Sequence, residues 1–331
     1  MFRLILLSVL LNVCSSDKCN VDLNGVKKKW SQRALSEPFE TDDALSSLQD
    51  AYKITIKGQE IPVLCKGTVK GLEKLYELDM DFNGIKEIEV GAFADVVHLR
   101  DLHLNKNRLK HIKAGVFNEL GISILRLGDN EIELIDQTAF DDMPNLRIIH
   151  LNNNKISAIN KEWFKNTPNV HQLTLENNLI TSLVEHNFKN LQGKHVFYDL
   201  PAWLNIDLSG NKITTIDPKA FDGLEELGIL SLDKNEISVL HEDTFKDVGR
   251  ISWINLTSNK IRCLPQHMKH ILKADATFLE NNPWNCTCLE TLQQQLKWRR
   301  LTSKVSISSD VLKCKIDDLK STVRDVLAEH E

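Results

Sequence analysis

A nine-residue pattern recurs eight times along this chain, and it restricts the possible folds more than any other feature. The eight segments begin at residues 75, 99, 122, 146, 170, 203, 227 and 251, and each reads L-x-x-L-x-L-x-x-N with apolar exchanges. Their final asparagines lie 23 or 24 residues apart, except for one interval of 33 between Asn178 and Asn211. A period of this length predicts a solenoid, in which each coil buries its apolar side chains against the next coil.

The pattern of apolar and polar residues in the repeat predicts which side chains are buried. Because side chains alternate along a strand, the apolar fourth and sixth positions face one side, and the third, fifth and seventh positions face the other. Apolar residues two and five positions after each asparagine, and a Phe ten positions after it in seven repeats, complete the expected core. We expect the asparagine amides to bond backbone groups of adjacent coils, which would otherwise be buried unpaired at a cost of about 1–3 kcal/mol each. The asparagines are therefore interpreted as scaffold.

Eight consecutive repeats of this kind resemble the extracellular leucine-rich-repeat proteins of the 24-residue class. The resemblance implies an α/β fold, a curved right-handed solenoid with a parallel β-sheet on its concave face and caps at both ends. The segment NNPWNCTCLETLQQQLKW (281–298), with Cys314, resembles the cysteine-flanked C-terminal cap of that family. The family usually has two cysteines downstream and this chain has one, so Cys263 is expected to supply the fourth sulfur. The alternative is a zinc site at Cys263, His267 and His270.

The chain is expected to divide into four parts. Residues 1–16 have the pattern of a secretory signal peptide, with a buried first helix or an uncleaved anchor as the alternatives. Residues 17–74 are predicted to form the N-terminal cap region, with a hairpin over 52–64. Residues 75–264 hold the eight repeats, and residues 265–331 hold the cysteine-containing C-terminal cap and helical tail.

Cysteine usage fits a secreted, extracellular protein. Six cysteines follow residue 16, in two groups at the ends of the repeats: Cys19, Cys65, Cys263, Cys286, Cys288 and Cys314. An even number grouped in this way suggests disulfides, although six cysteines allow fifteen pairings. At the N-terminal end we expect Cys19 to pair with Cys65.

The first candidate binding surface lies on the concave sheet. The register predicts that two isoleucines of neighbouring strands lie side by side, with cationic or titratable neighbours; this patch comprises His103, Ile124, Arg126, Ile148 and His150. An apolar centre of this kind is typical of a binding hot spot. The alternative is that the isoleucines merely favour the strand.

The second candidate is an insertion between Leu191 and Trp203, where eleven residues replace the usual one or two. Leu191 keeps the repeat register before it, and Trp203, Ile206 and Leu208 keep it afterwards. Residues 192–202 are therefore expected to leave the solenoid as a loop. Its tip carries His195, Val196, Phe197 and Tyr198. Such side chains either meet a partner or pack back on the solenoid, and the sequence leaves both open.

Two further features concern the surface. Sequons for N-glycosylation begin at Asn255 and Asn285, and a glycan on Asn255 would shield the sheet beside Trp253. A basic run, comprising Lys297, Arg299, Arg300 and Lys304, is interpreted as the solvated face of a cap helix rather than as a site for sulfated glycans.

The sequence favours binding over catalysis. It has no nucleophile elbow, phosphate loop, HExxH motif or CxxC pair, so no enzyme activity, cofactor or metal is expected. A formal net charge of −5 disfavours a nucleic-acid partner, and no later apolar stretch approaches membrane-spanning length. The hypothesis is a monomeric or weakly dimeric protein that binds an extracellular protein or glycoconjugate, in immune recognition or cell-surface signalling. The alternatives are a self-associating structural matrix protein and, from a third class, a hydrolase.

Overall fold

The computed structural model describes residues 51–69, 72–94, 96–191, 203–265, 268–298, 300–301, 304–307, 309–317 and 320, and the backbone of 196–197 and 200–201. Several predicted features lie outside these residues: the signal peptide, the N-terminal cap up to residue 50 with Cys19, residues His195, Tyr198, His267 and Arg299, and the side chains of Val196 and Phe197. The chain consists of two compact units. Unit 1 runs to residue 179 and includes 190–202, whereas unit 2 comprises 180–189 and 203–331.

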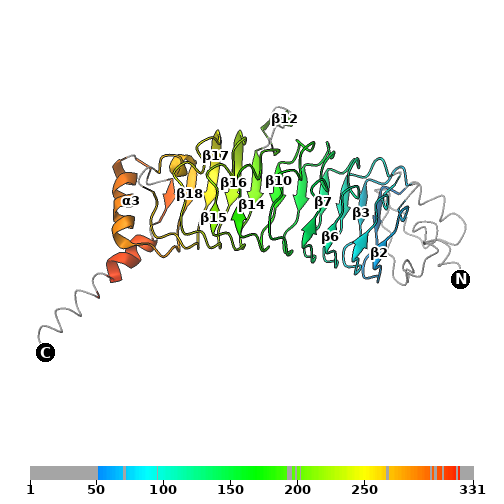
Figure 1. The fold of residues 1–331 in the computed structure, drawn as a ribbon, viewed down its shortest axis with the longest axis horizontal. Coiled ribbons are helices and arrows are strands. Elements are labelled where there is room, and N and C mark those ends of the chain that lie inside the picture. Colours follow the sequence, from blue (N-terminus) through cyan, green and yellow to red (C-terminus); the bar gives the residue numbers. More distant parts are fainter. Residues whose placement is uncertain are drawn as a thin grey trace, which may run out of the picture. The chain divides into compact units, whose positions relative to one another are not determined.

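Unit 1 is built on six short parallel strands (Figure 1). They are β1 (Lys53–Thr55), β3 (Glu77–Asp79), β5 (Asp101–His103), β7 (Ile124–Arg126), β9 (Ile148–His150) and β10 (Gln172–Thr174). Each pairs with the next in constant register, so equivalent repeat positions form straight columns across the sheet. Elsewhere in the same coils, β2 (Val63–Leu64) pairs with β4 (Glu87–Ile88), and β6 (His111–Ile112) pairs with β8 (Leu134–Ile135), again in parallel. The parallel-sheet solenoid predicted from the repeat is confirmed.

The core of unit 1 contains the side chains that the repeat pattern predicts. Strand leucines such as Leu102 are fully buried. The Phe residues ten positions after the asparagines stack from coil to coil, with ring centroids 6.2 Å apart for Phe93 and Phe117 and 5.8 Å apart for Phe140 and Phe164. Each coil therefore completes the core of its neighbours, and none has a core of its own.

The repeat asparagines form the backbone-bonding ladder expected of them. In Asn154, Nδ2 donates to the carbonyl oxygens of Leu127 and Leu151, both at 3.0 Å, and Oδ1 accepts from the N–H of Ile132 at 3.0 Å. Asn235 in unit 2 repeats this arrangement. One buried amide thus satisfies backbone groups of two coils, which confirms the scaffold interpretation.

A second column was not predicted from the sequence: the residue before each ladder asparagine has left-handed backbone geometry. Its φ lies between 53° and 65° at Phe82, Lys106, Asp129, Asn153 and Asn177 in unit 1, and at Gly210, Lys234, Ser258 and Asn281 in unit 2. The residue types differ widely, so the conformation is imposed by the turn that the asparagine closes and not by local preference.

The expected hairpin over residues 52–64 is wrong. β1 pairs in parallel with β3, and β2 pairs with β4, so the two strands belong to one coil instead of pairing with each other. Gln59 occupies the place of the ladder asparagine, and its backbone N–H donates to Oδ1 of Asn83 at 3.0 Å. Repeat geometry therefore starts before residue 75.

Unit 2 continues the same architecture. Its parallel strands are β14 (Leu204–Asp207), β16 (Glu226–Ser231), β17 (Arg250–Asn255), β18 (Ala276–Phe278) and β19 (Val305–Ser306), and β11 (Ser182–Leu183) pairs with β15 (Thr215–Ile216). A short 3-10 helix, η1 (Ile271–Lys273), precedes β18. Asn282 follows β18 and accepts from the N–H of Ile261 at 3.1 Å, so the ladder extends one coil beyond Asn259.

The register after the insertion differs from the prediction that Trp203 is the first core residue of its repeat. Leu204 is fully buried and pairs with Leu227, whereas Trp203 is only half-buried. The register then shifts between Leu204 and Ile206: Asn205 alone lies between them on β14, whereas Gly228 and Ile229 lie between their partners Leu227 and Leu230, so the extra residue of the bulge is on β16. Two adjacent apolar residues compete for one core position here, and the bulge gives it to Leu204.

The insertion itself contains a small hairpin. β12 (Val196–Phe197) and β13 (Leu200–Pro201) pair antiparallel, with Val196 opposite Pro201 and Phe197 opposite Leu200. These two strands form a sheet of their own, and the prediction that residues 192–202 leave the solenoid as a loop stays a prediction.

The C-terminal cap is a helix fixed by two disulfides. α3 (Cys286–Trp298) buries Leu289, Leu292 and Leu296, and its first turn is capped by Asn285, whose Oδ1 accepts from the N–H of Cys288 at 3.2 Å. Disulfides join Cys263 to Cys288 and Cys286 to Cys314. The zinc alternative fails because the Cys263 sulfur is already bonded. Cys65 is also disulfide-bonded, and its predicted pairing with Cys19 stays a prediction.

Candidate functional site

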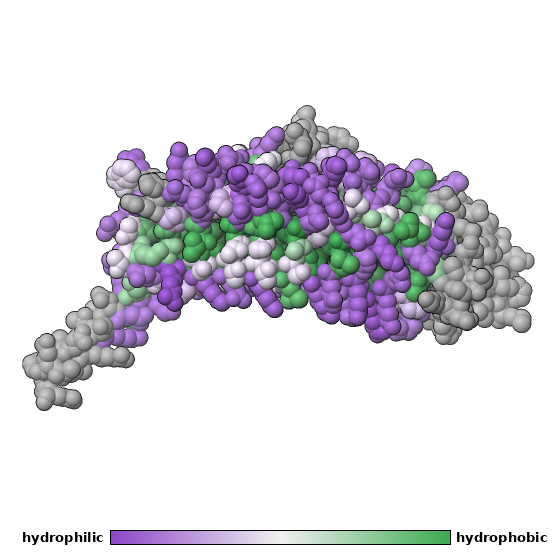
Figure 2. Space-filling view, viewed as in Figure 1, coloured by the Kyte–Doolittle hydropathy of each residue, from purple (hydrophilic) through white to green (hydrophobic). Residues whose placement is uncertain are grey.

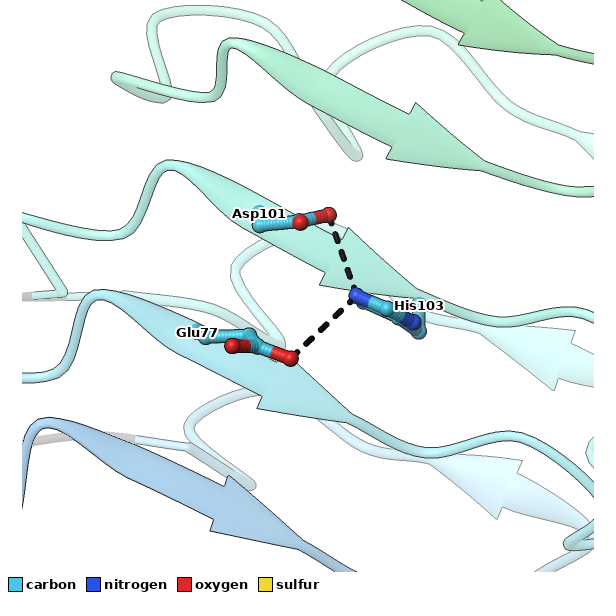
Figure 3. Close-up of side chains that lie close together, drawn as sticks. All are labelled: Glu77, Asp101 and His103. Carbon is cyan, nitrogen blue, oxygen red and sulfur yellow. Dashed lines mark ion pairs between the residues drawn. The ribbon is translucent and has the colours of Figure 1, made fainter. Parts of the chain in front are cut away.

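The sheet face of unit 1 carries a network of charged side chains around His103. Nε2 of His103 lies 3.2 Å from Oδ1 of Asp101 and 3.5 Å from Oε1 of Glu77 (Figure 3). The two acids occupy the third position of adjacent strands and the histidine the fifth position, so the constant register brings all three together. Glu77 also forms an ion pair with Lys53 on β1, the strand on the other side of β3.

Arg126 joins this network from the other side. Its Nη2 and Nε lie 3.2 Å and 3.3 Å from the two carboxylate oxygens of Asp101. Burial alone would raise the pKa of Asp101, but the close contacts with His103 and Arg126 outweigh burial and hold that pKa below its ordinary value. Asp101 is therefore an ionised anchor that fixes the guanidinium in one place.

A second acidic pair lies at the fifth and seventh positions of the coil of β3. The Nζ of Lys57 lies 2.7 Å from Asp79 and 3.9 Å from Asp81, and the hydrogen bond to Asp79 raises the pKa of Lys57. Burial raises the pKa of Asp81, and the Asp79 charge raises it further. Asp81 also accepts from the backbone N–H of Asn105 at 2.6 Å.

Two triads of this network have donor atoms close enough together to hold a metal ion: Glu77, Asp101 and His103, and Asp79, Asp81 and His103. Protein cations already balance these carboxylates, because Lys53, Lys57 and Arg126 pair with them. The arrangement fits an ion-pair network that orders the surface.

Next to the network the face becomes apolar. Ile124 and Ile148 lie directly opposite each other on β7 and β9, both half-buried. His150 lies beside Arg126, and its Nδ1 is 3.1 Å from Oγ1 of Thr174. Burial, with the neighbouring positive charge of Arg126, lowers the pKa of His150, so the ring is neutral near pH 7.

The structure thus places all five predicted patch residues on three adjacent strands, which we call the isoleucine patch: His103, Ile124, Arg126, Ile148 and His150. Sequence reasoning missed the partners that hold the charged members, chiefly Asp101 and Glu77. The sequence could have predicted the Asp101–Arg126 pair, because the repeat register places Asp101 opposite Ile124, and Arg126 is two residues further along the same strand.

Unit 2 presents a different surface on its strands. Ile229 and Trp253 lie opposite each other, 41% and 52% exposed, and the Trp253 ring contacts Phe278 edge-on with centroids 6.0 Å apart. We call these three residues the Trp253 strip. Beside it, the guanidinium of Arg250 lies 5.1 Å from the ring centroid of Trp203, a cation–π contact.

Apolar side chains also reach other parts of the surface. Figure 2 shows them gathered toward the middle of the face drawn, with hydrophilic residues on both borders. Exposed apolar residues outside the long parallel sheet include Val90, Leu134, Val184 and Val239. In the described part of the chain, no helix has the length and apolar character needed to cross a membrane.

Comparison with known proteins identifies the repeat. The family model described as Leucine rich repeat matches residues 52–109, 73–122, 98–156, 121–180, 144–193 and 183–237, more than half of the chain in total. The chain belongs to the leucine-rich-repeat family. The first match begins within one residue of β1, in agreement with the parallel pairing of that strand.

Curated relatives share part of the sequence. Leucine-rich repeat-containing protein 3B of Homo sapiens is 37% identical over 106 residues, which cover 31% of this chain and 40% of that protein. Trophoblast glycoprotein of Macaca fascicularis is 27% identical over 121 residues, covering 37% of this chain and 23% of that protein. The chain therefore spans less than half the length of these relatives.

Solved structures share the fold. The mouse RP105/MD-1 complex aligns over 75% of this chain and 41% of its own, with a TM-score of 0.61 and 21% identity. The Drosophila Toll–Spatzle complex aligns over 68% and 30%, with a TM-score of 0.58 and 19% identity. A TLR13–ssRNA13 complex aligns over 65% and 35%, with a TM-score of 0.52 and 20% identity.

Proposed function

We propose that this protein is a secreted recognition module that binds an extracellular protein through the isoleucine patch of unit 1. The observation that carries the proposal is the pairing of Ile124 with Ile148 among polar side chains that are already fixed in place. An apolar centre with an ordered polar surround loses little conformational entropy on binding. This is the arrangement expected of a hot spot.

The charges beside the patch favour a protein over a polyanion. Four carboxylates lie on the first strands of the face, at Glu77, Asp79, Asp81 and Asp101, and a phosphate backbone would approach them at an electrostatic cost. One of the structural neighbours is a complex with single-stranded RNA. The mixed charges of this face instead match a protein or a glycoconjugate with its own ion pairs.

Two other features support the proposed setting. The RP105 and Toll structures are complexes with MD-1 and Spatzle, so proteins of this fold bind other proteins in those cases. The disulfides of the C-terminal cap fit an oxidising, extracellular compartment. We extend the proposal to immune recognition or cell-surface signalling by a monomer or weak homodimer. The 192–202 insertion, with its β12–β13 hairpin, is proposed as a second contact.

The test identifies the partner first and then measures affinity. Secreted protein with a photo-cross-linking residue in place of Ile148 is used to capture extracellular proteins, and the captured protein is purified. We expect Ile124→Asp/Ile148→Asp to weaken its binding by about 30-fold or more. Ile229→Asp, at the same repeat position in unit 2, is the matched control and should bind as the wild type does.

Two results would overturn this proposal. One is unchanged affinity of a folded Ile124→Asp/Ile148→Asp variant. The other is capture of a second copy of the chain itself, with association that grows with concentration, which would instead support the structural, self-associating alternative.

A further inference from the structure

The Trp253 strip is an exposed aromatic surface on a rigid sheet. Trp253 is 52% exposed, although Ile229 lies opposite it on the next strand and the Phe278 ring lies 6.0 Å away, centroid to centroid, in a T-shaped arrangement. A large indole left in water is unfavourable and promotes association unless something covers it. We therefore expect another group to cover the strip.

Asn255 lies on the same strand, two residues after Trp253, and so on the same face. Its Oδ1 accepts from the backbone N–H of Thr257 at 3.1 Å, and its Nδ2 donates to Oδ1 of Asp233 at 3.1 Å. An amide nitrogen carries two hydrogens, and only one is used here. The other can be replaced without loss of either hydrogen bond.

We propose that Asn255 carries an N-linked glycan whose first sugar packs on the indole of Trp253, so that the chain's own carbohydrate covers the strip. Asn255, Leu256 and Thr257 supply the acceptor sequon. Residues two apart in a strand are separated by about 6.6 Å, a span that a sugar ring at the end of an asparagine side chain crosses. The apolar face of a pyranose ring and the flat indole are complementary surfaces.

The modification itself is a redox-neutral transfer. The sugar C1–O bond of a lipid-diphosphate-linked oligosaccharide breaks, the C1–Nδ2 bond forms, and the amide gives up one proton while the lipid diphosphate leaves. The donor belongs to the secretory pathway, so this inference rests on the proposed secretion. Transfer to the nascent chain would precede closure of the coil, and the strip would be covered as it forms.

The second sequon provides an internal control. Asn285 is exposed at the start of α3, where its Oδ1 caps the helix. The neighbouring Trp284 donates its Nε1–H to the carbonyl oxygen of Leu279 at 3.3 Å, so its indole is held to the cap. A sugar on Asn285 is therefore expected to stay in solvent.

The first experiment measures occupancy. The full chain is expressed in insect cells, and glycopeptides from the medium are analysed by mass spectrometry. We expect modified Asn255. A secreted chain with unmodified Asn255 overturns this inference and leaves secretion standing, whether or not Asn285 is modified. A chain that stays inside the cell with both sequons unmodified overturns both.

The second experiment measures packing on Trp253. Glycans are trimmed to a single sugar. Thr257→Ala removes the sequon and keeps the hydrogen bond from the backbone N–H of residue 257 to Oδ1 of Asn255. We expect Thr257→Ala to lower the melting temperature by about 2–4 °C with Trp253 present, and to have no effect in a Trp253→Thr background. Thr287→Ala, which removes the other sequon, should give the same result in both backgrounds. Equal effects of Thr257→Ala in both backgrounds would show that the sugar does not pack on Trp253.

Discussion

At the scale of single residues, two adjacent asparagines show how different the roles of one residue type are in this chain. Asn154 is buried and bonds backbone groups of two coils. Asn153 is exposed, has a φ of 53°, and exchanges side-chain hydrogen bonds with Asp129 and Asn177. Only the buried one satisfies groups that water cannot reach.

Asn154→Ala is therefore expected to lower the free energy of unfolding by about 3 kcal/mol, because it leaves a buried N–H and carbonyl groups unpaired. Asn153→Gly keeps the left-handed backbone and loses only exposed contacts, so it should change stability by no more than about 0.5 kcal/mol. Urea denaturation followed by circular dichroism measures both. Similar losses in the two variants would contradict the scaffold interpretation.

Asp101 gives the patch a defined pH dependence. Its pKa is lowered in the folded protein, so it adds stability above its unfolded pKa of about 3.9, and this stability is lost as the pH falls through the lower folded value. The stability gap between the wild type and Asp101→Asn should be widest near pH 7 and should narrow below about pH 4. Urea denaturation at several pH values measures the gap. A gap that is constant from pH 7 to pH 3 would show that the carboxylate charge is not responsible.

At the scale of secondary-structure elements, the repeat spelling predicted strands, core and ladder because each depends on a fixed spacing. The prediction fails where a segment has repeat geometry without the repeat sequence, or where two residues fit one repeat position. Residues 52–64 lack the ladder asparagine, so their sequence predicts a hairpin where the structure has a coil with two parallel strands. After the insertion Trp203 and Leu204 both suit a core position, and a bulge that depends on the packing of the next strand decides between them. The ion pairs of the patch likewise depend on register between strands, which one segment alone does not reveal.

Gly228 lies in the bulged segment of β16, between Leu227 and Leu230. A Cβ at position 228 would lie 2.5 Å from Oδ1 of Asn205 and 3.0 Å from Cβ of Trp203. That same Oδ1 accepts from the N–H of Ile229, so it cannot move without losing a hydrogen bond.

Gly228→Ala should therefore destabilise unit 2 by about 1–3 kcal/mol, seen as a lower melting temperature. Asn205→Ala combined with Gly228→Ala removes the closest contact and should recover part of the loss relative to Gly228→Ala alone. A harmless Gly228→Ala would mean that the bulge accommodates a side chain.

At the scale of the whole molecule, stability in a solenoid comes from contacts between neighbouring coils, so a local loss should stay local. The disulfides Cys263–Cys288 and Cys286–Cys314 close loops of 25 and 28 residues around α3 and β18, and each is worth about 3 kcal/mol on the chain-entropy estimate. Serine replacement of all four cysteines leaves the Cys65 disulfide intact, unlike reduction. The variant therefore tests the disulfides of the C-terminal cap alone.

Hydrogen exchange then reports how far the loss spreads. We expect faster amide exchange in β18 and α3 of the four-serine variant, because local unfolding of these elements is easier once no disulfide restricts the unfolded segment. Amides of β5, β7 and β9 should keep their protection, since they bond only to adjacent coils, and binding through the isoleucine patch should persist. Loss of protection in both regions together would mean that the chain unfolds as one cooperative unit, and that the cap governs the binding face as well as the end of the solenoid.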